Sequence, residues 1–216
     1  MNIVKNKVAS FIVIVLIILG ISGFLIYKTL YGNDNLPKVV VKVTNEIKGW
    51  DYTLDDRDTE LMKNEFTTLS DNLKSNNVNY EEYAKSLAKL YTIDLYTINN
   101  KVNIYDIPCL EYVHPSIKDN FRTNIKNTIY MYLQDNSDGT RNQKLPIVTD
   151  VSITDFKPST FKIDDKEYES FNVSVHITYK EDLDYDEDIN LDIIRDTKKL
   201  YVVKQTINEK DSSSSN

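Results

Sequence analysis

The chain has 216 residues, of which 41% are hydrophobic, and its formal net charge is −7. That hydrophobic fraction is enough for a packed core, so the composition excludes a wholly disordered chain. A negatively charged surface repels phosphate groups, and nucleic acid is therefore not an expected partner. The length suits one domain with a small appendage.

An uncharged apolar segment lies near the N-terminus, from residue 8 to residue 27. A helix of about twenty apolar residues crosses the hydrocarbon core of a bilayer. The alternative is a cleavable signal peptide, whose apolar region is shorter, about 7 to 15 residues, and precedes a site of small residues. The sequence therefore predicts a retained transmembrane helix at 8–27, preceded by a short tail at 1–7.

Basic residues flank this segment on both sides, with Lys5 and Lys7 before it and Lys28, Lys38 and Lys42 after it. The positive-inside rule therefore gives only a weak preference for either orientation. A short tail ahead of a long apolar segment usually stays in the cytoplasm. We accordingly expect a single-pass protein of the cell membrane, with a cytoplasmic N-terminus and an extracellular C-terminal domain.

The rest of the chain divides into three parts by composition and patterning. Residues 28–54 are expected to form a membrane-proximal linker with one short strand, and residues 55–208 a globular α+β domain. The polar, serine-rich segment 209–216 is expected to be a disordered tail.

Three amphipathic segments predict three helices in the first half of the domain. The first should begin near Asp55 and the second at Asn79, a favourable N-cap residue with Glu82 three positions later. The third should follow Pro115, with Ser116 as its N-cap. The inward faces of the first and third helices are expected to comprise Met62, Phe66, Leu69, Leu73, Ile117, Phe121, Ile125, Thr128 and Tyr132.

The second half predicts antiparallel strands. Apolar and polar residues alternate strictly over 171–179, which indicates a strand with one buried face, and a turn is expected at Asp164 and Asp165. Further strands are expected at 189–193 and 200–207. Helices followed by consecutive strands indicate an α+β fold, with about three helices packed on a curved antiparallel sheet.

Several segments carry a resemblance to known proteins. The segments 88–101 and 121–133, and the strand start Leu145-Pro146-Ile147-Val148, resemble uncharacterised single-pass membrane proteins of low-GC Gram-positive bacteria. The order of elements is similar to the nuclear transport factor 2-like, cone-shaped fold. More distantly, the architecture resembles the bitopic assembly factors of type IV secretion and conjugation systems. The likeness implies a cone with a pocket and names no chemistry, because fold does not determine function.

Asp94 is the candidate site residue with the most unusual position. A helical wheel places its carboxylate in the apolar arc of the second helix, next to Tyr91. One interpretation makes Asp94 and Tyr91 ligand-binding residues in the cone's pocket, with Asp94 as a possible general base. The other makes Asp94 a structural hydrogen-bond acceptor, because a buried carboxylate needs partners.

Neither a metal nor a cofactor is expected. His114 and His176 lack the helical spacing of paired metal ligands. The acidic segment 181–188 does not fit an EF-hand loop, since Glu187 occupies the glycine position and Ile193 the bidentate glutamate position. That segment is expected to be a solvated hairpin tip, with weak calcium binding or recognition of a basic partner as alternatives.

The only cysteine, Cys109, excludes an intramolecular disulfide and is expected to be a buried thiol. Because the sequence lacks a recognised catalytic motif, the first hypothesis is a non-catalytic interaction module of a cell-envelope assembly, with a protein partner. The second is a small-molecule binding domain that uses the cone's pocket. The third is an isomerase- or dehydratase-like enzyme with Asp94 as its base.

Overall fold

The computed structural model of the protein describes residues 39 and 41–207. The expected span at 8–27 and the tails at 1–7 and 209–216 lie outside these residues. Within residue 39 and residues 41–207, no helix combines the length and apolar character needed to cross a membrane. The elements are β1 (Val43–Ile47), β2 (Tyr52–Asp55), α2 (Glu60–Lys74), α3 (Tyr80–Tyr96), η1 (Ile98–Asn100), η2 (Pro115–Ile117), α4 (Lys118–Asn127), β3 (Val148–Ile163), β4 (Lys166–Tyr179), β5 (Asp188–Asp196) and β6 (Lys199–Ile207).

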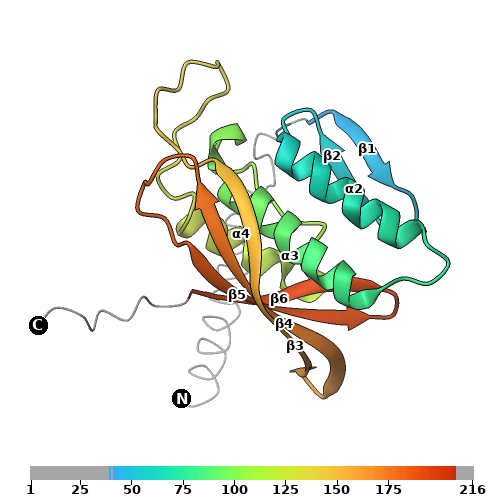
Figure 1. The fold of residues 1–216 in the computed structure, drawn as a ribbon. Helices are drawn as coiled ribbons and strands as arrows, with labels where there is room; N and C mark the ends of the chain where they lie inside the picture. The colour runs from blue at the N-terminus through green and yellow to red at the C-terminus, as the bar shows by residue number, and fades with distance from the viewer. Residues whose placement is uncertain (1–38, 40, 208–216) are drawn as a thin grey trace, which may run out of the picture. The chain divides into compact units, whose positions relative to one another are not determined.

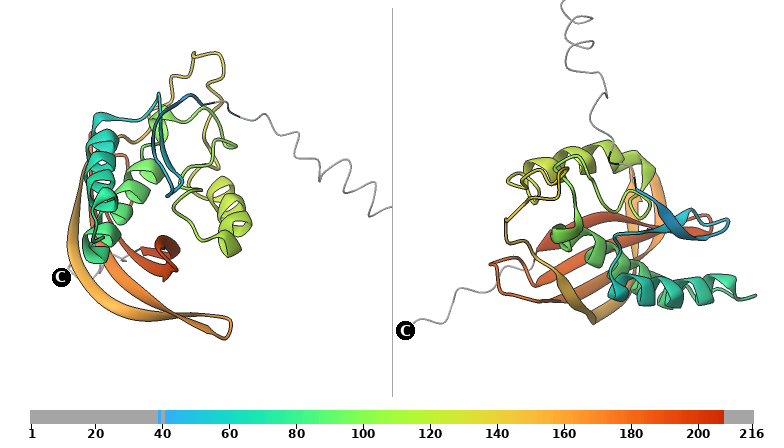
Figure 2. Two further views of the ribbon diagram at one scale, coloured as in Figure 1. Left: turned by 90° about the vertical axis from the view of Figure 1, so that its right-hand side faces the viewer. Right: turned by 90° about the horizontal axis from the view of Figure 1, so that it is seen from above.

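The fold of the described residues is α+β, as predicted, with three α-helices and a four-stranded antiparallel sheet in the order β3-β4-β5-β6 (Figure 1). A separate two-stranded sheet pairs β1 with β2. The four-stranded sheet is curved, and the long β3–β4 hairpin continues past the other strands (Figure 2). The expected turn of this hairpin is confirmed, with Asp164 in the left-handed region at φ 52°.

The predicted alternation in β4 is confirmed. Phe171, Val173, Val175 and Ile177 are buried, and the residues between them lie on the other face of the sheet. The expected strands near 189–193 and 200–207 are confirmed as β5 and β6. The period of two therefore identifies the face of the sheet that forms the core.

Helix α3 is the central helix and contacts all four strands of the larger sheet as well as α2. Asn79 is confirmed as its N-cap, because the Asn79 side chain accepts hydrogen bonds from the backbone of Glu81 and Glu82. In a full capping box, the side chain of Glu82 would accept a hydrogen bond from the backbone N–H of Asn79. Here the side chain of Asn72 accepts that bond instead. The helix ends at Tyr96, close to the expected stop.

Helix α2 begins later than predicted, at Glu60 rather than near Asp55. Its N-cap is Thr59, whose hydroxyl accepts a hydrogen bond from the backbone of Met62. Asp55 is instead the last residue of β2, and its N–H donates to the Asp58 carboxylate at 2.6 Å. The expected inward stripe is confirmed, because Met62, Phe66, Leu69 and Leu73 are all buried.

The start and end of α4 both differ from the sequence prediction. Ser116 is not the N-cap, because it lies within the 3-10 turn η2, which His114 caps by accepting a hydrogen bond from the Ser116 backbone at its imidazole Nδ1. The N-cap of α4 itself is Ile117, which forms no side-chain cap bond. The predicted inward position of Tyr132 is wrong, since this side chain is 82% exposed. The helix ends at Asn127, so helical spacing stops there and Tyr130 enters the core instead.

The β1–β2 hairpin packs into the same core as the rest of the domain, through Ile47, Tyr52 and Leu54. The compact unit that contains it starts at Val39. The domain boundary expected at residue 55 therefore falls on the last residue of β2. The sequence predicts a linker with one short strand over residues 28–54, whereas β1 and β2 are two paired strands that contribute to the core.

Candidate functional site

The Asp94 carboxylate lies at the inner side of α3, where the loop after the helix covers it. One oxygen, Oδ1, is 2.6 Å from the ammonium group of Lys101, and the other, Oδ2, accepts a hydrogen bond of 2.6 Å from the backbone N–H of Cys109. The side chains of Lys101 and Asp94 are 6% and 16% exposed. Both carboxylate oxygens are therefore engaged within the protein.

Burial alone would lower the pKa of Lys101, but the adjacent Asp94 charge and its hydrogen bond oppose this, and the net shift is upward. The ammonium group therefore stays charged, and it forms a buried ion pair with Asp94. Removing one member of such a pair leaves an uncompensated charge, which costs more than the pair itself contributes.

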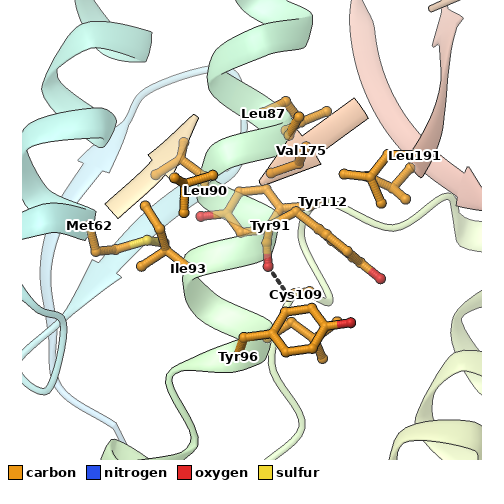
Figure 3. Close-up of a cluster of buried hydrophobic side chains, with 14 of the residues drawn as sticks. Met62, Leu87, Leu90, Tyr91, Ile93, Tyr96, Cys109, Tyr112, Val175 and Leu191 are labelled. Carbon is orange, nitrogen blue, oxygen red and sulfur yellow. Dashed lines mark hydrogen bonds between the residues drawn. The ribbon is translucent and has the colours of Figure 1, made fainter. Parts of the chain in front are cut away.

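Cys109 is confirmed as a buried thiol and connects the covering loop to α3. Its backbone adopts a left-handed conformation, φ 62°, which is uncommon for a residue with a side chain. Asp94 holds that backbone N–H, and the thiol donates to the carbonyl of Tyr91 at 3.2 Å (Figure 3). Burial, followed by the Asp94 charge, raises the pKa of the thiol well above its usual value, so it is a poor nucleophile.

Tyr91 is 2% exposed, and it connects α3 to β6. Its hydroxyl donates to Gln205 Oε1 at 2.8 Å, and Gln205 Nε2 donates to the hydroxyl of Tyr96 at 2.7 Å. The side chain of Asp94 therefore binds the covering loop, whereas the side chain of Tyr91 binds the sheet. Cys109 links the two residues through the backbone carbonyl of Tyr91, and the Tyr91 hydroxyl and the Asp94 carboxylate share no hydrogen-bond partner.

A second group of charged side chains, which are half-buried, surrounds the end of β2. Arg57 forms ion pairs with Asp55 and Asp106, and Asp106 also accepts a hydrogen bond from the backbone of Val102 at 2.8 Å. Burial, with a further contribution from the Asp55 charge, raises the pKa of Asp58 to about 6. These side chains hold the β2–α2 connection against the loop that covers Asp94.

Glu111 fixes that same loop to β2. Its carboxylate accepts hydrogen bonds from Thr53 N at 3.0 Å and from Thr53 Oγ1 at 2.9 Å. Burial raises the pKa of Glu111 to about 7 even though the Thr53 bonds oppose the shift. Sequence reasoning missed Glu111, Lys101 and Arg57, because nothing in the periodicity shows that a loop will be buried.

The folded-state pKa of Glu111 is above the ordinary value of about 4.3, so the folded protein binds this proton more tightly than the unfolded chain does. The stability contributed by the protonated group is complete below about pH 4.3 and is lost as the pH rises through about 7. The contribution of Glu111 to the free energy of unfolding should therefore fall between pH 5 and pH 8. In Glu111→Gln, the decrease in the free energy of unfolding over this pH range should be smaller than in the parent chain by about 1 to 3 kcal/mol.

Urea titrations of the full chain in detergent, followed by the fluorescence of Trp50, measure this difference. Glu60→Gln is the matched control, because the Glu60 side chain is 82% exposed and should leave the pH dependence unchanged. If the free energy of unfolding depended on pH in Glu111→Gln as it does in the parent chain, the raised pKa of Glu111 would be contradicted.

His114 contacts both a serine and an aspartate, as in the triad of hydrolases. Its Nδ1 lies 2.7 Å from Ser116 Oγ, and its Nε2 lies 3.8 Å from Asp196 Oδ2. The neighbouring N–H groups are already used, since Ser116 N donates to the imidazole and Ile117 N donates to the His114 carbonyl. These two N–H groups are therefore not free to bind an oxyanion, as a hydrolase site would require. The contacts of His114 indicate a helix cap instead.

His176 and the acidic segment 181–188, at which no metal site is expected, lie on the surface. His176 lies on the polar face of the sheet with its Nδ1 2.8 Å from Asp188 Oδ1, and both side chains are about 40% exposed. Within the acidic segment, Asp182 Oδ1 accepts a hydrogen bond from the backbone of Asp184 at 3.1 Å. Within the described part of the chain, no group of three or more His, Cys, Asp or Glu side chains is arranged to hold a metal.

Comparison with protein-family models, with curated proteins and with solved structures gives no match for this chain. Functional interpretation therefore depends on the site geometry and on the surface.

Proposed function

We propose that the protein is a membrane-anchored, non-catalytic interaction module of a cell-envelope assembly. In this proposal residues 8–27 form the single span, the N-terminus is cytoplasmic and the α+β domain is extracellular. The domain binds a protein partner and no nucleic acid. We also propose that its curved sheet and helices form a nuclear transport factor 2-like cone, which the position of α3 across all four strands supports.

The observation that carries the interaction role is a group of exposed large side chains near the end of α4. Tyr132 is 82% exposed, Met131 is 48% exposed and Tyr105 is 37% exposed. Lys126 of α4 lies 5.7 Å from the centre of the Tyr105 ring, so Tyr105 belongs to the same surface. Tyrosine and methionine are enriched in protein interfaces. The three side chains are exposed here and are not part of the domain's own core, which indicates a surface for a partner.

The buried polar groups support the absence of catalysis in this proposal. Asp94 is bound to Lys101 and to the Cys109 backbone, so it has no free oxygen for a substrate proton. A general base must instead lie within hydrogen-bond reach of its substrate. The geometry favours the structural interpretation of Asp94 over the enzyme hypothesis.

A photo-crosslinking amino acid at Tyr132 should form a covalent product with another envelope protein in living cells. The same substitution at Asn64 is the control, because Asn64 is exposed on α2, outside the α4 surface. Product at Tyr132 and not at Asn64 supports the interaction role. Equal or absent product at the two positions would contradict it.

Small-molecule binding is a second candidate because the surface has a depression of about 220 Å³. Its walls come from η1, from the loop before β3 and from the β4–β5 connection. The lining comprises Asn99, Gln143, Lys144, Leu145, Pro146, Ile147, Lys180, Glu181 and Leu183. The volume is below the range of about 300 to 1,000 Å³ typical of ligand pockets, so this function ranks second.

A further inference from the structure

A row of basic side chains lies along α4. Lys118, Arg122 and Lys126 follow one another at intervals of four residues, so they share one face of the helix, with about 5 to 6 Å between neighbouring Cβ atoms. The Arg122 side chain is 46% exposed, and Lys118 and Lys126 are half-buried. We call these three residues the basic row.

The fold keeps the basic row at the surface. The residue before each of its members packs on the core, namely Ile117, Phe121 and Ile125. Because each residue turns the helix by about 100°, the row lies beside the core-facing stripe and not within it. Long basic side chains in such a position lie along the surface with their charged ends in solvent.

The domain itself neutralises little of this charge. Arg122 Nη1 lies 3.0 Å from Asp119 Oδ1, but the Asp119 side chain is 97% exposed, so this ion pair contributes little. Among the described residues, Lys118 and Lys126 form no ion pair, and Lys126 contacts the Tyr105 ring instead. Residues 115–134 contain three basic residues and one acidic residue, a net charge of +2, whereas the whole chain carries −7.

The exposed side chains of the α4 surface begin where the basic row ends. Tyr105 lies against Lys126, the last member of the row. Met131 N–H donates to the Thr128 carbonyl at 3.1 Å, which folds the chain into a turn directly after the helix. Met131 and Tyr132 therefore stay near the end of α4, so the cations adjoin the exposed aromatic and thioether side chains.

We propose that the α4 surface binds an acidic segment of a different envelope protein, whose carboxylates contact the basic row and whose apolar side chains pack on Tyr105, Met131 and Tyr132. This inference rests on the proposed interaction role and names the chemistry of the partner. Opposite charges steer an encounter and fix its register. Because the chain as a whole is negative, it repels an acidic partner elsewhere, and the basic row determines where that partner binds.

Two observations favour a polypeptide over anionic lipid headgroups. Lipid recognition by a basic cluster commonly takes about four to eight lysine or arginine residues, whereas the basic row has three. A helix that lies in a membrane interface also buries its apolar face in the lipid. Phe121 and Ile125 of α4 already pack on the core, so this helix has no second apolar face to insert.

Peptide binding to the full chain in detergent tests the charge requirement. The probe is the fluorescent peptide Asp-Glu-Leu-Asp-Tyr-Asp-Glu, and its control has Asn and Gln in place of Asp and Glu. Fluorescence anisotropy should give a Kd for the acidic peptide that is lower by about tenfold or more. Raising the salt from about 0.05 M to about 0.5 M should remove most of this difference. Equal Kd values for the two peptides at low salt would overturn the proposal.

A double variant tests whether the basic row is the binding site. Arg122→Gln with Lys126→Gln should weaken binding of the acidic peptide by about tenfold, and its urea transition checks that the fold is kept. The control, Lys48→Gln with Lys74→Gln, removes the same charge from two exposed lysines outside the α4 surface and should leave the Kd within about twofold. Equal weakening in the two double variants would mean that only net charge matters and would overturn the proposal.

Two measurements on the parent surface do not depend on losing a side chain from the basic row. Asp119→Asn removes the only acidic residue of α4 and should tighten binding of the acidic peptide. Unchanged or weaker binding would contradict the placement of the peptide on the row. Glycerol 3-phosphate, which represents an anionic lipid headgroup, should not displace the peptide at matched ionic strength. Displacement would assign the surface to lipid and overturn the proposal.

Photo-crosslinking in cells separates failure of this inference from failure of the interaction role. With the photo-reactive residue at Tyr132, the product with another envelope protein should decrease by about fivefold or more in Arg122→Gln with Lys126→Gln, and not in Lys48→Gln with Lys74→Gln. An unchanged product would keep the interaction role and overturn the acidic partner. No product in the parent chain would overturn both. A product with lipid or with a second copy of this chain would overturn the assignment to a different protein.

Discussion

Val175→Asp should unfold the domain. Val175 is 1% exposed at the centre of β4, where it pairs with Ile153 of β3 and Ile189 of β5. Figure 3 shows its side chain in the core beside Leu191. A carboxylate there has no partner and no water, so we expect a loss of more than about 4 kcal/mol.

The matched control is the next residue, His176, whose side chain is 41% exposed on the opposite face. His176→Gln should change the free energy of unfolding by less than about 0.5 kcal/mol. An aspartate at that position is a poorer control, because the Asp188 carboxylate already lies 2.8 Å from the imidazole and would repel it. Equal losses in Val175→Asp and His176→Gln, measured by urea titration, would mean that both faces of β4 are buried.

Periodic segments of this domain could be predicted because their pattern has a single physical cause. The alternation from Phe171 to Tyr179 follows from one buried face, and Asn79 caps α3 through bonds to the next turn. The prediction was wrong for the end of α4, where the helix stops although the apolar spacing of the sequence continues. Tyr132 continues the spacing of α4, but the chain leaves helical geometry at Thr128, with φ −128° and ψ −95°.

The hydrogen-bonded group of Asp94, Lys101 and Cys109 could be predicted only in part. The helical wheel places Asp94 on the inner side of α3, but its two partners come from the loop beyond the helix, 7 and 15 residues away. The left-handed backbone of Cys109 carries no signal in the sequence, since glycine and asparagine are the residues that mark this conformation. Burial of Lys101 depends on the loop's path, which local pattern does not encode.

Asp94→Ala should be strongly destabilising. It removes at once the counter-charge of Lys101, whose side chain is 6% exposed, and the acceptor of the Cys109 N–H. Breaking a buried pair in this way costs about 3 to 5 kcal/mol. Asp94→Asn keeps an oxygen for the Cys109 N–H but leaves Lys101 without a negative partner, so it should lose most of the same stability.

A double-mutant cycle separates the ion pair from other effects of the substitution. In Asp94→Asn with Lys101→Met, the unpaired cation is gone, and the loss should be smaller than the sum of the two single losses by about 1 to 3 kcal/mol. The control cycle uses Glu81 and Lys85, an exposed pair on the same helix, where the coupling should be below about 0.5 kcal/mol. Urea titrations of each variant measure both couplings.

Additive losses at Asp94 and Lys101 would show that the pair is not coupled. A gain in stability in both Asp94→Ala and Asp94→Asn would favour a functional carboxylate held under strain, because catalytic groups are commonly kept at a cost in stability. The short contacts of both Asp94 oxygens favour the opposite result. Loss of the loop that Asp94 anchors would also release Glu111 from Thr53, so the effect should extend from α3 to the β1–β2 hairpin.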